Sequence, residues 1–267
     1  MDARNHRACF SVGMVVALVL AMPAAADQLD DIKARGRLVV GVTESSPPFS
    51  YRKAGLGIVG YDVDLADRVA KNLGVTVQKI TIINADRIPA LQQGRVDLVA
   101  AGMTRSKGRS NDIDFSIAYL DSPHKVLVRK SSGIVHIAQL ASHKLALVKS
   151  ASVDAELKAA VPTMEIAFFD DYNGAFAALM DGRVDGFLAD KTLLLWFAEK
   201  SGRPETFVLV DDYELPRTAG FGLKKNEASF IEFVNQTLLN LEATGEAAKI
   251  FDAWFAPMPR TFHIQPD

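Results

Sequence analysis

The polar loop over residues 101–119 contains the residues best suited to hold a small charged ligand. It follows a predicted strand at 96–101 and brings Arg109 together with the hydroxyls of Thr104 and Ser106. A planar guanidinium binds a carboxylate through two parallel hydrogen bonds, and hydroxyls add donors to the same oxygens. Because open α/β sheets bind ligands beyond the carboxyl ends of their strands, we expect a binding site here. The alternative is that Arg109 is an ordinary solvated loop arginine.

The composition limits the classes of function. The 267 residues are 49% hydrophobic and 23% charged, which is typical of a globular protein long enough for two domains. The formal net charge is −2, so we expect no nucleic-acid partner, which would need a basic surface.

The N-terminal residues 1–26 have the pattern of a cleavable signal peptide. Basic residues around Arg4 and Arg7 precede an apolar run at 10–22, and an Ala24-Ala25-Ala26 cleavage site follows. A membrane anchor is the alternative, but the apolar run is short for a span of roughly 20 residues. We therefore expect an exported protein whose mature chain begins near Asp27.

The single cysteine, Cys9, lies inside this predicted signal. The mature chain would then have no thiol, which excludes disulfides, thiolate metal ligands and cysteine nucleophiles. An exported protein without cysteine fits the bacterial periplasm.

Strands and helices alternate along the mature chain. The first unit reads βαβαβ, which predicts a parallel sheet with right-handed crossovers, and a second unit repeats the order. Segments 91–97 and 179–185 both run from a helix through a Gly-Arg turn into Val-Asp. The predicted strands are 38–42, 75–83, 96–101, 125–129, 145–148, 165–169, 184–189, 207–210 and 219–223, and the predicted helices are 29–35, 62–73, 87–93, 154–160, 174–180, 192–200, 228–243 and 246–255.

The predicted order of elements indicates two lobes joined by two chain crossings. We assign residues 27–122 to the first lobe, 123–225 to the second, and 226–267 to the first lobe again. Two crossings between two lobes are the layout of a binding protein that closes about a hinge.

The chain resembles the polar amino-acid branch of the bacterial periplasmic solute-binding proteins, most closely the glutamate/aspartate-binding members that supply ABC importers. This resemblance implies the two-lobe α/β fold of type II periplasmic binding proteins, a permease partner, a monomer, and no metal or cofactor. The segments that carry it are Pro48-Phe49-Ser50-Tyr51, Gly60-Tyr61-Asp62-Val63-Asp64-Leu65, 84–92, Gly102-Met103-Thr104 with Arg109, 113–116, Gly182-Arg183-Val184-Asp185 with Asp190, and 244–255.

The resemblance also implies roles for individual residues. Arg109 would bind the α-carboxylate of an amino acid, together with Thr104 and the backbone of Gly102. Asp190 would accept the α-ammonium, and Ser152 would add a hydroxyl near a helix N-terminus. The alternative for Asp190 and Ser152 is that each caps a helix, which is a common role for both residue types.

Recognition of the ligand side chain is less well defined. The resemblance places Arg87 at the side-chain carboxylate, whereas Thr43 stands where a second arginine is usual. The stacking aromatics of glutamine-type and basic-type relatives are replaced by Ser46 and Asn84, so we expect a ligand with a polar or acidic side chain. The alternative is that Arg87 points to solvent and pairs with a neighbouring acid, either Glu44 or Asp86.

Tyr172 stands where acidic-ligand binders often have histidine, so it could donate its hydroxyl to the ligand. The alternative is that Tyr172 simply packs.

An enzyme on the same fold is the competing function, because some relatives are dehydratases of the cyclohexadienyl/arogenate type. Acid or base catalysis needs a positioned group with a shifted pKa. The candidates near the inferred site are few, and Asp190 already has a binding role. The histidines are too irregularly spaced for a metal site. We therefore expect a binding protein, with an opine or another zwitterion as an alternative ligand.

Overall fold

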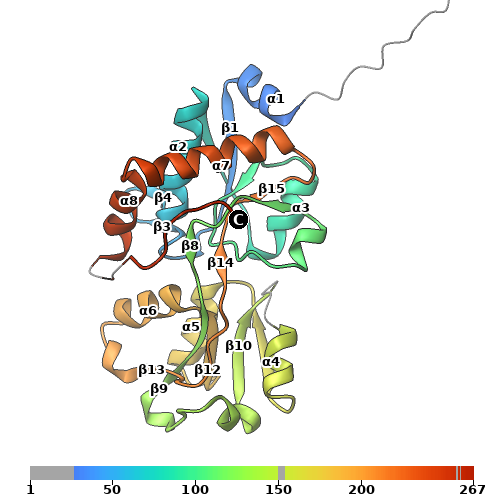
Figure 1. The fold of residues 1–267 in the computed structure, drawn as a ribbon. Coiled ribbons are helices and arrows are strands. Elements are labelled where there is room, and N and C mark those ends of the chain that lie inside the picture. Colours follow the sequence, from blue (N-terminus) through green and yellow to red (C-terminus); the bar gives the residue numbers. More distant parts are fainter. Residues whose placement is uncertain (1–26, 150–153, 257, 259) are drawn as a thin grey trace, which may run out of the picture.

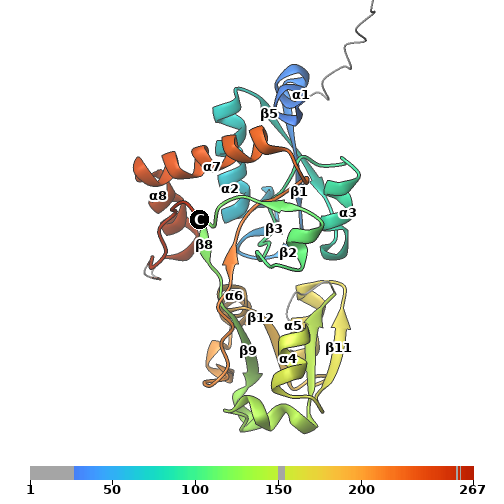
Figure 2. The same cartoon turned by 45° about the vertical axis from the view of Figure 1, so that its right-hand side comes forward.

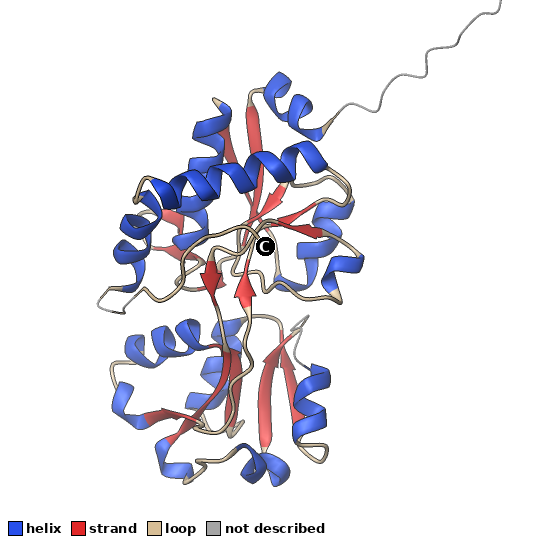
Figure 3. Ribbon diagram, in the orientation of Figure 1, coloured by secondary structure: helices blue, strands red, loops and turns tan. Residues whose placement is uncertain are grey.

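The chain folds into two lobes that lie one above the other and are joined by two extended segments (Figure 1). The computed structural model describes residues 27–149, 154–256, 258 and 260–267. Each lobe contains a five-stranded sheet with helices packed around it (Figure 3). The predicted two-lobe α/β fold is confirmed.

The first lobe has the strand order β5-β1-β6-β15-β7. Strand β1 pairs in parallel with β5 and β6, and β15 pairs antiparallel with β6 and β7. The elements of this lobe are α1 (Gln28–Arg35), β1 (Arg37–Val42), β2 (Ser45–Ser46), β3 (Ser50–Lys53), β4 (Gly57–Val59), α2 (Tyr61–Leu73), β5 (Thr76–Thr81), η1 (Asn84–Asp86), α3 (Arg87–Gln92), β6 (Leu98–Val99), η2 (Arg109–Asn111), β7 (Asp114–Phe115), β15 (Gly222–Leu223), α7 (Ala228–Ala243) and α8 (Glu246–Phe255).

The second lobe has the strand order β11-β10-β12-β9-β13. Strand β10 pairs in parallel with β11 and β12, whereas β9 runs antiparallel to β12 and β13. The elements of this lobe are β9 (His124–Arg129), η3 (Lys130–Ser132), η4 (Ile137–Ser142), β10 (Lys144–Val148), α4 (Asp154–Ala160), β11 (Glu165–Phe169), α5 (Tyr172–Met180), β12 (Gly186–Asp190), α6 (Lys191–Lys200), η5 (Pro204–Thr206) and β13 (Phe207–Leu209).

A two-stranded pair connects the lobes. Strand β8 (Leu120–Asp121) runs antiparallel to β14 (Thr218–Ala219), and both lie between the lobes in two views (Figure 2). The predicted strand 219–223 is therefore wrong as a single element, because its first part belongs to this hinge and its second part to the sheet of the first lobe. We keep the lobe boundary after residue 122 as a proposal. The predicted boundary after residue 225 comes too late in the chain, because β15 already belongs to the sheet of the first lobe.

The expectation of a parallel sheet holds only in part. The three strands of each βαβαβ run are parallel, as expected. Strands β15 and β9, which the chain enters directly from the hinge, are antiparallel to β6 and β12.

The repeated Gly-Arg turn has the same hydrogen bonds in both lobes. Gly94 and Gly182 have φ values of 65° and 74°, which is the left-handed region that glycine favours. The carboxylates three residues later accept from backbone N–H groups of the neighbouring strand, Asp97 from Val39 at 2.8 Å and Asp185 from Lys144 at 3.0 Å. Each aspartate thus holds the turn against the sheet.

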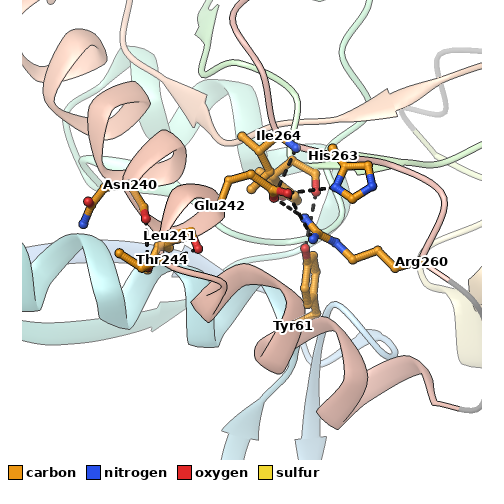
Figure 4. A network of polar contacts seen from close by, with 9 residues as sticks. Tyr61, Asn240, Leu241, Glu242, Thr244, Arg260, His263 and Ile264 are labelled. Carbon is orange, nitrogen blue, oxygen red and sulfur yellow. Dashed lines mark hydrogen bonds and ion pairs between the residues drawn. The ribbon is translucent and has the colours of Figure 1, made fainter.

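The C-terminal segment folds back on the first lobe (Figure 4). Glu242, near the end of α7, accepts from Arg260, from His263 Nδ1 at 2.9 Å and from the backbone N–H of Ile264 at 3.3 Å. At its end Asp267 pairs with Arg105, in the loop that carries the predicted ligand residues. The segment therefore braces that loop.

A backbone contact at Gly60 gives the first testable prediction. The φ of Gly60 is 151°, and a Cβ there would lie 2.0 Å from the carbonyl oxygen of Phe49. Gly55 also has a positive φ of 77°, but a Cβ there would meet nothing within 4 Å. Both substitutions to alanine strain the backbone, whereas only Gly60→Ala adds a clash. We expect Gly60→Ala to lose about 1–3 kcal/mol more unfolding free energy than Gly55→Ala in urea denaturation. Equal losses would contradict the contact.

Candidate ligand-binding site

A pocket between the lobes collects side chains from both. Five of the eight predicted ligand residues line it, namely Arg87, Gly102, Thr104, Arg109 and Tyr172. The rest of the lining comes from the second lobe and consists of His124, Val148, Lys149, Leu188 and Ala189. The pocket therefore combines the loop after β6 with the ends of β10 and β12.

Arg109 lines the pocket at the start of the short η2 turn. Its Nη1 donates to the carbonyl oxygen of Thr104 at 2.9 Å, which fixes the guanidinium relative to its own loop. Burial, and then the charge of Arg87, lower the pKa of Arg109 to about 9. Since a lowered pKa means that the charged form is disfavoured, an anion in the pocket would relieve this cost.

Arg87 is 3% exposed and donates to backbone carbonyls rather than to an acid. Its Nε lies 3.0 Å from the carbonyl oxygen of Asn84, and its Nη1 lies 3.3 Å from that of Ala101. Burial lowers its pKa. Asp86 pairs with Arg95 at 2.7 Å and Glu44 pairs with Arg52, so the solvent-facing alternative for Arg87 is wrong.

The loop between these arginines is fixed from three sides. Gly102 has a φ of 59°, and a Cβ there would lie 2.7 Å from the ring of Phe49. Thr104 forms an antiparallel bridge with Ala219 of the hinge, and its hydroxyl lies 3.3 Å from Nε2 of His124. Gly102 and Thr104 are therefore held in place by their surroundings, and their contact with a ligand stays a prediction.

Asp190 ends β12 and caps α6, accepting from the N–H of Leu193 at 2.9 Å. Its other oxygen accepts from the hydroxyl of Ser122 in the hinge. Burial raises the pKa of Asp190 to about 6, although these hydrogen bonds oppose the shift. Asp190 does not line the pocket, whereas its neighbours Leu188 and Ala189 do. The capping role is present, and the role at the ligand ammonium stays a proposal.

The remaining predicted residues lie in different places. Tyr172 lines the pocket and also packs near Phe187, with ring centroids 6.4 Å apart. Thr43 is buried, its hydroxyl lies 2.9 Å from that of Ser46, and it lines a neighbouring cavity instead. Ser152 lies outside the described residues.

Two buried groups near the pocket escaped the sequence analysis. Asp62 is fully buried, and its Oδ2 accepts from the N–H of Gly102 at 2.6 Å and the hydroxyl of Tyr119 at 2.7 Å. Burial raises its pKa to about 7 despite both hydrogen bonds. His124 is 8% exposed and lines the pocket directly. Asp62 belongs to a segment that carried the resemblance, but helical periodicity alone places it in the first turn of a helix, where acids are usually exposed.

The described residues contain neither a metal-binding cluster nor a membrane-spanning helix. Across 27–149 and 154–267, apart from residues 257 and 259, no three His, Cys, Asp or Glu side chains are grouped to hold a metal ion. Within the same residues, none of the helices has the length and hydropathy needed to cross a bilayer.

Residues 38–257 match the family described as bacterial extracellular solute-binding proteins, family 3. The glutamate/aspartate import solute-binding protein of Escherichia coli is 30% identical, over 90% of this chain and 83% of that protein. The crystal structure of the cysteine-binding protein of Campylobacter jejuni has a TM-score of 0.81 at 28% identity, covering 86% of this chain and 94% of that chain. An ancestral amino acid-binding protein described as a precursor of cyclohexadienyl dehydratase has a TM-score of 0.78 at 30% identity. The match covers 85% of this chain and 99% of that chain.

The raised pKa of Asp62 gives a prediction about pH. A carboxyl whose folded pKa of about 7 exceeds its ordinary 3.8 binds more protons when folded, so it lowers stability as pH rises from about 4 to 7. We expect wild type to lose unfolding free energy relative to Asp62→Asn over this window, by up to about 4 kcal/mol. Urea denaturation at several pH values measures the difference. If the difference in unfolding free energy between wild type and Asp62→Asn did not change with pH, the raised pKa of Asp62 would be contradicted. Asp31→Asn, which replaces an exposed carboxyl of α1, is the control.

Proposed function

The chain is a member of the bacterial extracellular solute-binding proteins, family 3, and from this premise we propose that it captures an acidic L-amino acid and delivers it to an ABC importer. Capture would occur between the lobes, and the delivered ligand would pass to a membrane permease. The E. coli relative, which is described as a glutamate/aspartate import protein, supports this choice of ligand class.

The observation that carries the proposal is that two buried guanidinium groups face one pocket. Arg87 and Arg109 both line it, and the positive charge of Arg87 lowers the pKa of Arg109. The described lining contains no carboxylate, and Asp62, whose charge raises the pKa of Arg87, lies outside it. A buried charge is costly unless it is paired, so a ligand that supplies carboxylates would gain most here.

An acidic amino acid has the complementary set of charges. Its α-carboxylate would bind Arg109 and the hydroxyl of Thr104, and its side-chain carboxylate would bind Arg87. The α-ammonium would approach the end of β12. We assign Asp190 there as the negative charge that binds it. The buried Asp190 carboxyl, whose pKa is raised to about 6, would be stabilised in its ionised form by that ammonium.

Closure of the lobes follows from the position of this pocket. Its lining comes from both lobes, and the β8–β14 pair joins them. A ligand that contacts both sides binds the closed form more tightly, so it shifts the population toward closure. A permease could then distinguish the closed, ligand-bound form of the protein from the open form.

The remaining features of the proposal follow from the family. An extracellular solute-binding protein that serves an importer works in the periplasm, and the predicted signal peptide over residues 1–26 would bring it there. We propose that it acts there as a monomer.

A dehydratase is the second candidate, because the chain is similar to an ancestral precursor of cyclohexadienyl dehydratase. Proton transfer would need a group that changes charge near neutral pH beside the substrate. The carboxyls of Asp62 and Asp190, whose pKa values burial raises to about 7 and about 6, lie outside the described lining, and burial lowers the pKa of His124, which does line the pocket, to about 3, so that it is a weak base. We therefore expect no turnover when the purified protein is incubated with prephenate or arogenate.

Arg109→Ala tests the α-carboxylate site. Loss of one partner from a buried charged pair costs about 2–5 kcal/mol, so affinity for L-glutamate should fall roughly 30-fold to several thousand-fold. Calorimetry measures the loss. Arg95→Ala removes an arginine that pairs with Asp86 outside the pocket, and it should bind normally. Near-normal affinity of Arg109→Ala would count against the site.

Arg87→Ala tests the side-chain pocket. If Arg87 binds the second carboxylate, the variant should lose affinity for L-glutamate and L-aspartate much more than for L-glutamine, which lacks that charge. Titrations with all three ligands give the selectivity directly, and L-glutamine serves as the internal control for folding. A loss of the same size for glutamine would sink the assignment of Arg87.

A further inference from the structure

His124 connects the hinge to the ligand pocket. It is the first residue of β9, and its backbone forms an antiparallel bridge with Leu215, in the segment that leads back to β14. The β9–β12 register places it directly opposite Asp190. Its Nε2 lies 3.3 Å from the Thr104 hydroxyl, whereas its Nδ1 is buried and has no hydrogen-bond partner among the residues that the structure describes.

The unpartnered Nδ1 decides which ring nitrogen carries the proton. Burial, and then the charges of Arg217 and Arg109, lower the pKa of His124 to about 3, so the ring is neutral and one nitrogen is a donor. A proton on Nδ1 would leave a buried N–H without an acceptor, whereas a proton on Nε2 leaves only a lone pair unused. An orphaned buried N–H is the rarer and costlier arrangement. The proton therefore belongs on Nε2.

This tautomer fixes the Thr104 hydroxyl as well. Nε2–H donates to Thr104 Oγ1, so the hydroxyl hydrogen cannot point back at His124. Among the described residues, the Thr104 hydroxyl has no hydrogen-bond partner other than His124. The free direction for the hydroxyl hydrogen is the pocket, which Thr104, His124 and Arg109 all line.

We propose that His124 is a positioning residue that turns the Thr104 hydroxyl into a donor aimed at a ligand carboxylate held by Arg109. The ligand step rests on the proposed function, since it requires an anionic ligand. Without the histidine, the hydroxyl is free to rotate, and ordering it on binding costs free energy.

The same hinge segment also orients the opposite side of the site. Ser122, two residues before His124, donates to Asp190. The segment from Ser122 to His124 thus holds both the group assigned to the ligand carboxylate, Thr104, and the group assigned to the ammonium, Asp190. Movement of this segment would change both contacts together.

The direction of the hydrogen bond can be measured without any ligand. Long-range ¹H–¹⁵N correlation spectra report the tautomer of each histidine, and the His124 signals are assigned by their absence from His124→Gln. We expect a neutral ring with its proton on Nε2 at pH 7. A proton on Nδ1, or a charged ring, would overturn the proposal.

The effect on binding is measured by calorimetry with L-glutamate. His124→Phe and Thr104→Val should each weaken binding about tenfold, and the double variant should be no weaker than either one, because both remove the same directed donor. His124→Gln, whose amide nitrogen can donate as Nε2 does, should bind within about threefold of wild type. The positioning role would be contradicted if the losses of binding free energy in His124→Phe and Thr104→Val added up in the double variant. It would also be contradicted if His124→Gln bound L-glutamate as weakly as His124→Phe.

Two controls keep the outcomes separate. If His124→Phe is poorly folded by its melting curve, the comparison of His124→Gln with Thr104→Val still tests the donor. If wild type does not bind L-glutamate, the proposed ligand class fails and the ligand step with it, while the tautomer spectrum still decides the direction of the His124–Thr104 hydrogen bond.

Discussion

Two guanidinium groups that face one desolvated pocket are the constraint on which the rest of the site depends. Arg87 is held by backbone carbonyls and Arg109 by the carbonyl of Thr104, so neither is neutralised by these bonds. Burial and mutual repulsion lower the pKa of Arg109 to about 9. Bringing these two positive charges together is therefore electrostatically unfavourable, and the anionic ligand that we propose would offset part of that cost.

The surrounding fold keeps these charges in place. The loop after β6 is bound to Asp62 through Gly102, to the hinge strand β14, and to the C-terminal segment through Arg105 and Asp267. Each contact reaches the loop from a different part of the chain. Since the hinge is one of them, the ligand site and the movement of the lobes are mechanically linked.

Much of this fold could be predicted from the sequence because helical periodicity and strand-length apolar runs are local signals. The extents of α2, α7 and α8 follow from their apolar faces, and Gly74 marks the end of α2. The split of 219–223 between β14 and β15 could not be predicted, since a change of partner strand depends on distant segments. That Thr43 lines a neighbouring cavity could not be predicted from the sequence either. The burial of Asp62 and His124 was equally unpredictable, because burial of a polar side chain depends on the packing around it.

The most direct measurement of the central claim is the change in melting temperature caused by two ligands of almost identical shape, L-glutamate and L-glutamine. They differ in one charge, and a ligand that binds only the folded protein raises its melting temperature by an amount that increases with the logarithm of its affinity. If the two arginines select an acidic ligand, L-glutamate should raise the melting temperature by several degrees and L-glutamine by much less. An equal shift for both, or a larger one for L-glutamine, would contradict the account.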